Sequence, residues 1–399
     1  MLSRFLFLLF CACVTFFAAA QCPIRFKGNN ASSVAVYIEE ISTGKKIVDY
    51  NGQKALIPAS VLKAITCATA MERLGGDYRF VTTFDLIGTD PEKGIGDIVV
   101  RAVADPTTGS REFNSSMHLP DSVTAALAAR GINYIDGNIV FDNSILPEGG
   151  GPVPQWEVED VSESYGVGLY PFNWLDNYFE EHFIIPSPPE YFAEILSENL
   201  TSNEIEIGGN ISEATDSVPV RVINLFTNYS PPLREIMRTT MVKSLNLMAE
   251  GILRAISPKE SRDSALSAVK RTWQKHDIDL SQSRLLDGSG LSRGNTISAS
   301  SIASVLSYMA KSKYARDYVS LFPVAGKEGT VKNFLSGTRL SGKLALKSGT
   351  MTGVHCYAGY LLKGSARQPT HTIVIMVNNF YCSRAQLRKA IETYLLQVL

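Results

Sequence analysis

Hydrophobic and polar positions follow different periods along this chain, and the period changes twice. Residues 33–50 have the alternation of a β-hairpin around a Ser-Thr-Gly turn. Pro58 introduces a helix over about residues 60–74, which a Gly-Gly pair closes. Apolar residues lie nearly all round this helix, so we expect it to run through the interior of its domain.

Residues 84–224 have another character, with short β-rich runs between clusters of Gly, Pro and Asn-Ser. The runs at residues 97–101 and 137–141 are typical of strands, and helical periodicity is scarce. This pattern predicts a separate, strand-dominated insert.

Helical patterning resumes after the Ser-Pro-Pro sequence at residues 230–232, a good cap followed by proline in the first turn. The residues on both sides of the insert show the same mixture of helical and strand patterning. We therefore predict an α+β protein: an antiparallel sheet flanked by helices, built from residues 21–83 and 225–399. The insert at residues 84–224 interrupts this domain and overhangs its cleft. The predicted helices cover residues 232–240, 247–256, 258–275, 298–310 and 384–398, and the predicted strands residues 344–348, 355–362 and 371–378.

Composition narrows the function classes. The chain has 399 residues, enough for two or three domains, and 45% of them are hydrophobic, as expected of a globular protein. Because 38 basic residues stand against 39 acidic ones, the charge balance argues against nucleic-acid binding.

The first twenty residues have the pattern of a signal peptide. Arg4 supplies the positive start, residues 5–17 the apolar run, and three alanines at 18–20 a cleavage site. A lipoprotein with acylated Cys22 is the rival interpretation. Both place the mature protein outside the cytoplasm, and we predict a periplasmic protein with no transmembrane segment in the mature chain.

Cysteine and histidine spacing indicates neither a fixed disulfide nor a metal. The mature chain keeps four cysteines, whose three pairings all remain open: Cys22, Cys67, Cys356 and Cys382. No CxxC or HExxH spacing occurs. We predict no metal and no other cofactor.

Three short motifs carry the chemistry, in this order: SxxK at Ser60 and Lys63, SxN at Ser244 and Asn246, and KSG at residues 347–349. Residues three apart on a helix share a face, so the Lys63 amine can reach the Ser60 hydroxyl. A serine needs an adjacent base, and a lysine serves as one when burial and nearby cations lower its pKa. Ser60 also lies at a helix start, where backbone N–H groups favour negative charge.

The other two motifs suit a peptide substrate. Ser244 can relay a proton, and Asn246 can hydrogen-bond a substrate amide. The KSG motif lies on a predicted strand, and an edge strand of this kind can bind an extended peptide by strand addition. Lys347 and the hydroxyls of this strand could then hold the peptide's terminal carboxylate.

With these motifs the chain resembles peptidase family S13, the class C low-molecular-mass penicillin-binding proteins. The resemblance extends to the SPPL sequence at residues 230–233, DGSGLSR at residues 287–293 and KSGTM at residues 347–351. It implies a β-lactamase/transpeptidase-like fold with a large insert between SxxK and SxN. The implied activity is that of a serine D-alanyl-D-alanine carboxypeptidase or endopeptidase, acting on peptidoglycan peptides and acylated by β-lactams.

The resemblance also implies roles for the motif residues. Ser60 is the nucleophile and Lys63 its general base, while Ser244 and Lys347 pass a proton to the leaving amine. Asn246 aligns the acyl chain. The backbone N–H groups of Ser60 and of the residue after KSG form the oxyanion hole.

Further residues are assigned to substrate binding by the same resemblance. Ser348, Gly349 and Thr350 belong to the strand that binds the peptide. The remaining three form a pocket for the free end of a diaminopimelate side chain, with opposite charges placed to hold a zwitterion. These are Asp142, Arg293 and Met351.

Other interpretations remain open. A β-lactamase shares the three motifs but needs rapid hydrolysis of its acyl-enzyme, and a catalytically silent muropeptide or β-lactam binder would need no activated nucleophile. Ser292 satisfies GxSxG, but the strand and helix that a nucleophile elbow needs do not flank it. We interpret His355 as a strand residue near the cleft rather than a catalytic base.

Overall fold

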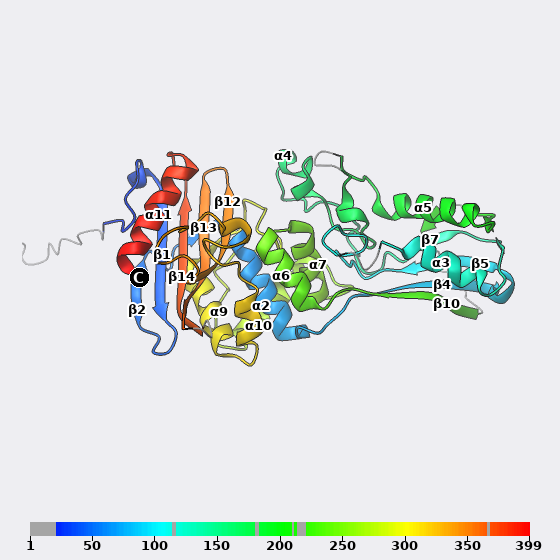
Figure 1. Ribbon diagram of the computed structural model, residues 1–399, viewed down its shortest axis with the longest axis horizontal. Helices are drawn as coiled ribbons and strands as arrows, with labels where there is room; N and C mark the ends of the chain where they lie inside the picture. Colours follow the sequence, from blue (N-terminus) through cyan, green and yellow to red (C-terminus); the bar gives the residue numbers. More distant parts are fainter. Residues whose placement is uncertain (1–20, 114–116, 180–182, 210, 214–220, 365–367) are drawn as a thin grey trace, which may run out of the picture.

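The computed structural model describes residues 21–113, 117–179, 183–209, 211–213, 221–364 and 368–399. The predicted signal peptide, residues 1–20, lies outside the described residues. Figure 1 shows an elongated molecule with a sheet at each end and a group of helices between them. Within the described ranges, no helix is both long and apolar enough to cross a membrane.

The first sheet joins the two ends of the chain. Its five strands are antiparallel and run in the order β12-β13-β14-β1-β2. The predicted hairpin supplies two of them, and the strands predicted near the C-terminus supply the other three. Their bounds are β1 (Ser33–Glu40), β2 (Lys46–Tyr50), β12 (Leu344–Met351), β13 (Val354–Lys363) and β14 (Gln368–Asn378).

Both faces of this sheet are covered. Val34, Val36 and Ile38 pack on the side of helix α11 (Arg384–Val398), whereas Ala35 and Tyr37 belong to the core on the opposite side. Alternating side chains of one strand therefore serve two hydrophobic layers, because successive strand residues point to opposite faces. The predicted α+β class, an antiparallel sheet flanked by helices, is confirmed.

Helix α2 (Leu62–Leu74) lies in the hydrophobic core on the side of the first sheet opposite α11. Its residues from Leu62 to Met71 are all buried, as its nearly continuous apolar surface predicts. A short 3₁₀ turn, η2 (Ala59–Val61), precedes it and contains Ser60. The surrounding helices are α6 (Leu233–Lys243), α7 (Asn246–Ile256), α8 (Arg262–Gln274), α9 (Ala299–Lys311) and α10 (Ala315–Ser320).

Helix α8 begins later than predicted. The sequence pattern placed its start at residue 258, but the Ser261 hydroxyl accepts a hydrogen bond from the Ser264 N–H and caps the helix there. A serine cap satisfies one of the free N–H groups of the first turn, so it sets the start.

The middle of the chain forms a second five-stranded sheet with its own core. Its order is β10-β4-β5-β7-β9, and the two predicted strands appear as β5 and β7, paired in parallel. Phe84, Phe172 and Phe192 are buried in this core, and their rings contact one another. The strand bounds are β4 (Val81–Asp90), β5 (Ile95–Arg101), β7 (Ile139–Phe141), β9 (Ile211–Glu213) and β10 (Arg221–Tyr229).

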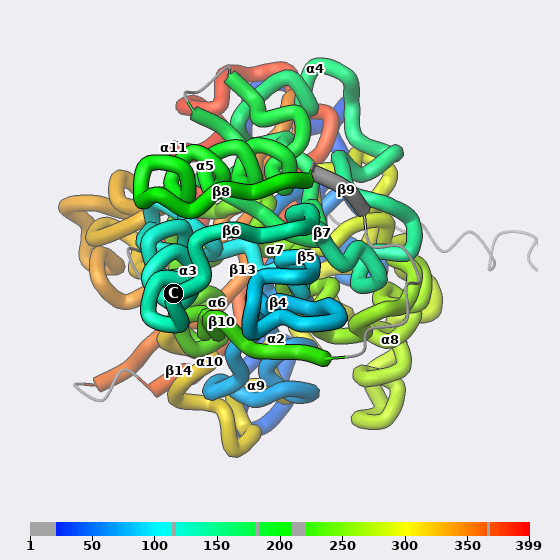
Figure 2. The backbone as a smooth tube through the Cα atoms, turned by 90° about the vertical axis from the view of Figure 1, so that its right-hand side faces the viewer, coloured from blue at the N-terminus to red at the C-terminus, as the bar shows by residue number. Residues whose placement is uncertain are grey.

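Two helices that the sequence analysis did not predict lie beside the second sheet, α3 (Leu119–Ala128) and α5 (Pro188–Ser202), as Figure 2 shows. In α5 the buried side chains of Phe192, Leu196 and Leu200 follow each other at four-residue intervals, so the signal was present in the sequence. The smaller elements are β3 (Ala55–Leu56), which pairs with β11 (Ile297–Ser298), β6 (Tyr134–Ile135), which pairs with β8 (Glu206–Ile207), and α4 (Val158–Val161).

Candidate active site

The three sequence motifs meet in one place. The SxxK motif lies at the junction of η2 and α2, and the SxN motif lies at the turn between α6 and α7. The KSG motif lies on β12, the edge strand of the first sheet within the described chain. Hydrogen bonds join Lys63 to Asn246 and Lys347 to Ser244. The SxN motif is therefore bonded to both of the other motifs.

The Lys63 amine is fully buried and has three polar neighbours. Its Nζ lies 2.9 Å from the Ser60 Oγ, 2.6 Å from the Asn246 Oδ1 and 2.8 Å from the Ser289 carbonyl oxygen. A neutral amine has two N–H donors and one lone pair. These neighbours match that form, because two are carbonyl-type acceptors and the third is a hydroxyl that can donate to the lone pair.

Burial also favours the neutral form. It lowers the pKa of Lys63 to about 8, against the opposing influence of the nearby Asp287 and Glu250 carboxyls. At pH 7 roughly a tenth of the amine is then unprotonated, compared with far less for an exposed lysine. The site therefore contains a base adjacent to a hydroxyl at neutral pH.

Lys347 forms the second half of the site. Its Nζ donates to the Ser244 Oγ at 2.9 Å and to the Ser348 carbonyl oxygen at 2.7 Å. Burial lowers its pKa well below the usual value, and the nearby Lys63 lowers it further because two buried ammonium groups repel each other. Ser244 has a left-handed backbone (φ 67°) at the end of α6, which directs its hydroxyl toward this lysine.

The DGSGLSR sequence forms a loop behind the nucleophile. Gly290 has φ +81°, and a Cβ there would lie 2.0 Å from the Ala59 carbonyl oxygen, so only glycine permits this approach to the turn that holds Ser60. The Asp287 carboxylate organises the loop by accepting hydrogen bonds from the Gly290 and Ser292 N–H groups at 2.7 and 2.6 Å.

Glu250 holds the same loop from α7. Its buried carboxyl accepts hydrogen bonds from the N–H of Gly288 at 3.0 Å and that of Ser289 at 2.8 Å. Burial first, and the charge of Asp287 second, raise the pKa of Glu250 to about 7. Because Ser289 also accepts a hydrogen bond from Lys63, this contact fixes one neighbour of the catalytic amine.

Trp156 and Tyr165 of the inserted segment contact the site. The Trp156 Nε1 donates to the Asp287 Oδ2 at 2.9 Å, and the Asn246 Nδ2 donates to the Tyr165 carbonyl oxygen at 2.7 Å. The second bond orients the Asn246 amide, leaving its oxygen toward Lys63. The segment that carries Trp156 and Tyr165 thus supports the SxN motif and the DGSGLSR loop.

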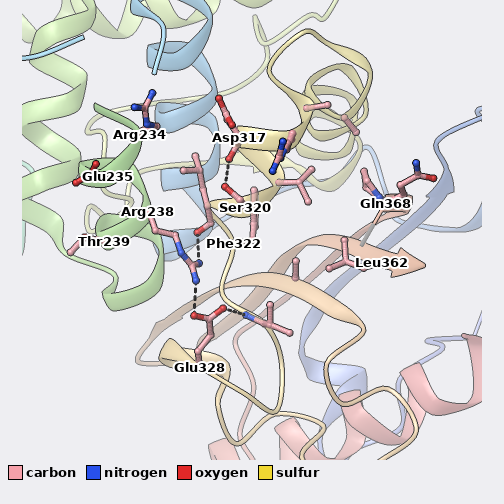
Figure 3. Close-up of a pocket in the computed structure, with 18 of the residues that line it drawn as sticks. Arg234, Glu235, Arg238, Thr239, Asp317, Ser320, Phe322, Glu328, Leu362 and Gln368 are labelled. Carbon is pink, nitrogen blue, oxygen red and sulfur yellow. Dashed lines mark hydrogen bonds and ion pairs between the residues drawn. The ribbon is translucent and has the colours of Figure 1, made fainter. Parts of the chain in front are cut away.

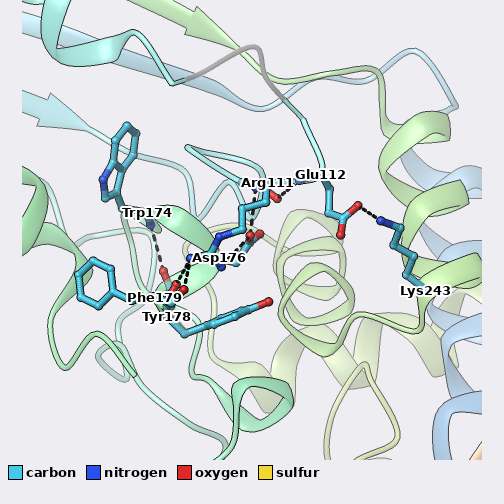
Figure 4. Close-up of polar contacts among 9 residues, drawn as sticks. Arg111, Glu112, Trp174, Asp176, Tyr178, Phe179 and Lys243 are labelled. Atoms are coloured by element: carbon cyan, nitrogen blue, oxygen red, sulfur yellow. Dashed lines mark hydrogen bonds and ion pairs between the residues drawn. The ribbon is translucent and has the colours of Figure 1, made fainter. Parts of the chain in front are cut away.

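A third tie reaches the residue before the SxN motif. Glu112 forms an ion pair with Lys243, the last residue of α6, next to Ser244 (Figure 4). The neighbouring Arg111 donates to the carbonyl oxygens of Tyr178 and Phe179, both at 2.7 Å. The C-terminal end of α6 is therefore bound to the inserted segment.

The residues predicted to bind diaminopimelate are only partly brought together. Arg293 donates to the Thr352 carbonyl oxygen at 3.1 Å, beside Met351 at the end of β12. Asp142 follows β7, and its Oδ1 accepts from the Ser144 N–H at 3.0 Å. Among the described residues no hydrogen bond or ion pair joins Asp142 to Arg293.

The Ser292 side chain forms a structural hydrogen bond and is not placed as a nucleophile. Its hydroxyl donates to the Gln155 carbonyl oxygen at 3.2 Å, within the loop after Asp287 and with no strand before it or helix directly after it. The arrangement of a nucleophile elbow is therefore absent at this serine. The four cysteines of the described chain are all free thiols: Cys22, Cys67, Cys356 and Cys382.

A separate cavity of about 1020 Å³ lies between α6, α10 and the first sheet (Figure 3). Its wall includes the ion pair between Arg238 and Glu328 (2.5 Å), together with Phe322 and Leu362. None of the side chains of the three motifs lines it. We therefore place the chemistry at the motifs and not in this cavity.

Sequence reasoning missed Trp156 and Tyr165, and it matched Glu250 to the family without giving it a role. Glu250 follows Asn246 by four residues on a helix, so helical spacing could have placed it on the same face. Trp156 and Tyr165 carried no such signal, since their partners lie far away in the sequence. Their contacts depend on how the inserted segment folds back over α7.

Comparisons with known proteins identify the family to which the chain belongs. The chain matches the D-Ala-D-Ala carboxypeptidase 3 (S13) family over residues 27–180 and 176–396. It is similar to the D-alanyl-D-alanine carboxypeptidase DacB of Haemophilus influenzae, with 25% identity over 423 residues, 88% of this chain and 86% of that protein. The D-alanyl-D-alanine carboxypeptidase of Actinomadura sp. (strain R39) is 23% identical, over 82% of this chain and 74% of that protein.

Solved structures show the same fold. Penicillin binding protein 4 (dacB) from Haemophilus influenzae has a TM-score of 0.81 at 23% identity, over 94% of this chain and 97% of that chain. A predatory endopeptidase from Bdellovibrio bacteriovorus, in complex with an immunity protein, has a TM-score of 0.60 at 21% identity, over 92% and 93%. With a family match that spans most of its length, the chain belongs to the D-Ala-D-Ala carboxypeptidase 3 (S13) family.

Proposed function

We propose that this protein is a serine D-alanyl-D-alanine peptidase that cleaves peptidoglycan stem peptides through an acyl-enzyme on Ser60. The observation that carries the proposal is the set of three neighbours around the buried Lys63 amine, one of which is the Ser60 hydroxyl at 2.9 Å. Membership of the S13 family supports the same activity.

The first step forms the acyl-enzyme. The Ser60 hydroxyl gives its proton to the neutral Lys63 amine while its Oγ attacks the carbonyl carbon of the penultimate D-alanine. The negative charge that develops on the carbonyl oxygen is received by the backbone N–H groups of Ser60 and Thr350. Asn246 aligns the acyl chain.

Collapse of this intermediate breaks the peptide bond. The proton that Lys63 took from Ser60 passes to the leaving amine through the Ser244 hydroxyl, which Lys347 contacts at 2.9 Å, so Lys63 is neutral again. Water then attacks the ester carbonyl and gives a proton to Lys63. Lys63 passes this proton to the Ser60 Oγ as the ester bond breaks, which releases the shortened peptide and restores the Ser60 hydroxyl. A β-lactam acylates Ser60 in the same way, but its leaving amine stays attached to the acyl group.

The substrate peptide binds along β12, the strand that carries residues 347–350 and is called the KSGT strand below. Its edge position leaves room for an extended peptide, and the hydroxyls of Ser348 and Thr350 receive the terminal carboxylate. Asp142, Arg293 and Met351 form the pocket for a diaminopimelate side chain, which requires the segment after β7 and the end of β12 to face one ligand.

We also propose how the chain is divided into domains and where the protein acts. Residues 21–83 and 225–399 form the peptidase domain, and residues 84–224 form the inserted domain; their separate hydrophobic cores support this division. The signal-like pattern at residues 1–20 supports export to the periplasm, where peptidoglycan is the substrate.

Product analysis tests the function. The purified protein is incubated with a muropeptide ending in D-Ala-D-Ala and with a dimer crosslinked through D-Ala and diaminopimelate. We expect release of D-alanine, opening of the crosslink, or both, and loss of every product in Ser60→Ala. The matched control Ser292→Ala should retain activity. Activity in Ser60→Ala, or no product from the unaltered protein, would refute the proposal.

A further inference from the structure

The outer face of the KSGT strand carries a second set of hydrogen bonds. Ser348 and Thr350 project from the same face of β12, because they alternate along the strand. The Ser348 Oγ donates to the Thr330 Oγ1 at 2.7 Å, and the Thr350 Oγ1 lies 3.4 Å from the His355 Nδ1. Each hydroxyl of the strand therefore has a partner outside the three motifs.

His355 is held from its other side. It lies directly opposite Thr350 on β13, with its Nε2 2.9 Å from the Tyr357 hydroxyl, and the Tyr357 ring is stacked on Phe334 at 4.2 Å. The side chain is only 7% exposed. The imidazole thus connects a packed aromatic pair to the exposed hydroxyl of Thr350.

The charge state of His355 suits this connection. Burial, with Arg384 and Arg388 of α11 as further causes, lowers the pKa of His355 to about 4. At neutral pH the ring is then uncharged and has one N–H donor and one acceptor nitrogen. It can hold a hydroxyl on one side and a phenol on the other, but in only one proton order at a time.

We propose that Thr330 and His355 are positioning residues that orient the Ser348 and Thr350 hydroxyls toward the substrate's terminal carboxylate. This inference rests on the proposed function, in which those two hydroxyls receive that carboxylate. Neither Thr330 nor His355 needs to touch the substrate.

Proton counting defines what each residue does. A carboxylate only accepts hydrogen bonds, so each strand hydroxyl must turn its single proton toward it. The Ser348 oxygen then accepts from Thr330, which reverses the bond seen in the structure. On the other side Tyr357 donates to the His355 Nε2, and the His355 Nδ1–H donates to Thr350. Binding of the carboxylate therefore selects the Nδ1–H tautomer.

Kinetics with two matched substrates test the proposal. One is an N-acylated peptide ending in D-Ala-D-Ala, and the other is its C-terminal carboxamide. Thr330→Val, at an exposed position, should raise KM for the carboxylate substrate about tenfold and leave kcat/KM for the carboxamide unchanged, since Ser348 loses the partner that turns its proton toward the carboxylate. Thr330→Ser should restore KM, and Thr393→Val, an exposed threonine on α11, should have no effect.

His355 is tested in the same assay. His355→Phe should raise KM selectively for the carboxylate substrate, and His355→Asn should restore much of it because its amide can replace Nδ1. Equal losses on both substrates, or no loss in Thr330→Val, would overturn the proposal. Failure of the unaltered protein to cleave both the carboxylate substrate and a dimer crosslinked through D-Ala would instead refute the proposed function.

A spectroscopic measurement tests the tautomer independently of activity. ¹⁵N NMR of histidine-labelled protein, with the His355 signal identified by its loss in His355→Asn, reports which ring nitrogen carries the proton. After acylation by penicillin, which also carries a carboxylate, Nδ1 should be protonated. A His355 with its proton on Nε2 in the penicilloyl enzyme would contradict the proposed proton order.

Discussion

Gly349 and Ser60 approach each other so closely that no side chain fits between them. A Cβ built on Gly349 would lie 3.0 Å from the Ser60 backbone nitrogen and 2.6 Å from the Pro58 carbonyl oxygen. The KSGT strand is thus packed directly against the turn that carries the nucleophile. This contact sets the spacing between the two N–H groups that we assign to the oxyanion hole.

Gly349→Ala should therefore impair acylation more than folding. The added methyl group must push β12 away from η2, and a displacement of about 1 Å costs on the order of 100-fold in rate. Stopped-flow acylation by a fluorescent penicillin measures the effect, and thermal unfolding measures stability. The control is Gly76→Ala, whose Cβ would meet nothing closer than 3.4 Å. Acylation of Gly349→Ala at the unaltered rate would show that this contact does not set the geometry.

Acylation should depend on pH through Lys63. The lysine acts as a base only when unprotonated, and its pKa is lowered to about 8. The acylation rate constant should therefore rise with pH and level off above about pH 8. Penicillin acylation measured from pH 5 to 10 provides the profile. A rate that falls as pH rises toward 8 would contradict the role of Lys63 as base.

Glu250→Gln should move that profile to lower pH. The Glu250 carboxylate stabilises the charged form of Lys63, so its removal lowers the lysine pKa further. The same pH series on the variant gives the shift. Glu198→Gln, an exposed position on α5, serves as the matched control and should leave the profile in place. A shift toward higher pH in Glu250→Gln would be inconsistent with the electrostatics described.

Glu250 should also make stability depend on pH. Its pKa is about 7 in the folded protein and 4.5 in a free side chain, so the folded state binds the proton more tightly. The contribution to the free energy of unfolding is full below pH 4.5 and is lost as pH rises to about 7. Urea unfolding at several pH values should show a smaller decline in Glu250→Gln. An unchanged or steeper decline would contradict the pKa shift.

Trp156→Phe should slow acylation by about tenfold, because the buried Asp287 loses one of its hydrogen bonds. Trp174→Phe is a matched control, since the Trp174 Nε1 is buried without a hydrogen-bond partner among the described residues. It should lower thermal stability but leave acylation intact. Equal acylation rates for Trp156→Phe and the unaltered protein would show that the insert does not support the DGSGLSR loop.

Local patterns in the sequence predicted the elements that carry the motifs. Residues 384–398 form a helix with the predicted bounds, and the spacing of Ser60 and Lys63 gives the contact expected of one helical turn. The start of α8 at Arg262 depends on a serine cap, which is a weak signal, and α3 has only ten residues. The 15 residues of α5 carry a four-residue spacing of buried side chains, so the sequence alone could have predicted this helix.

Long-range contacts were not predictable in the same way. The bond from Asn246 to Tyr165 joins residues 81 positions apart, and the bond from Trp156 to Asp287 joins residues 131 apart. No periodicity links such positions; only the folding of the inserted segment over α7 does. The sequence therefore indicated the reacting groups, whereas the structure shows what holds them in place.

The residue that penicillin acylates shows whether Ser60 is the nucleophile. Purified protein is incubated with benzylpenicillin, digested and mapped by mass spectrometry. We predict a single penicilloyl group on the peptide that contains Ser60, and none in Ser60→Ala. An adduct on another residue such as Ser244 or Ser292, or no adduct at all, would contradict this account.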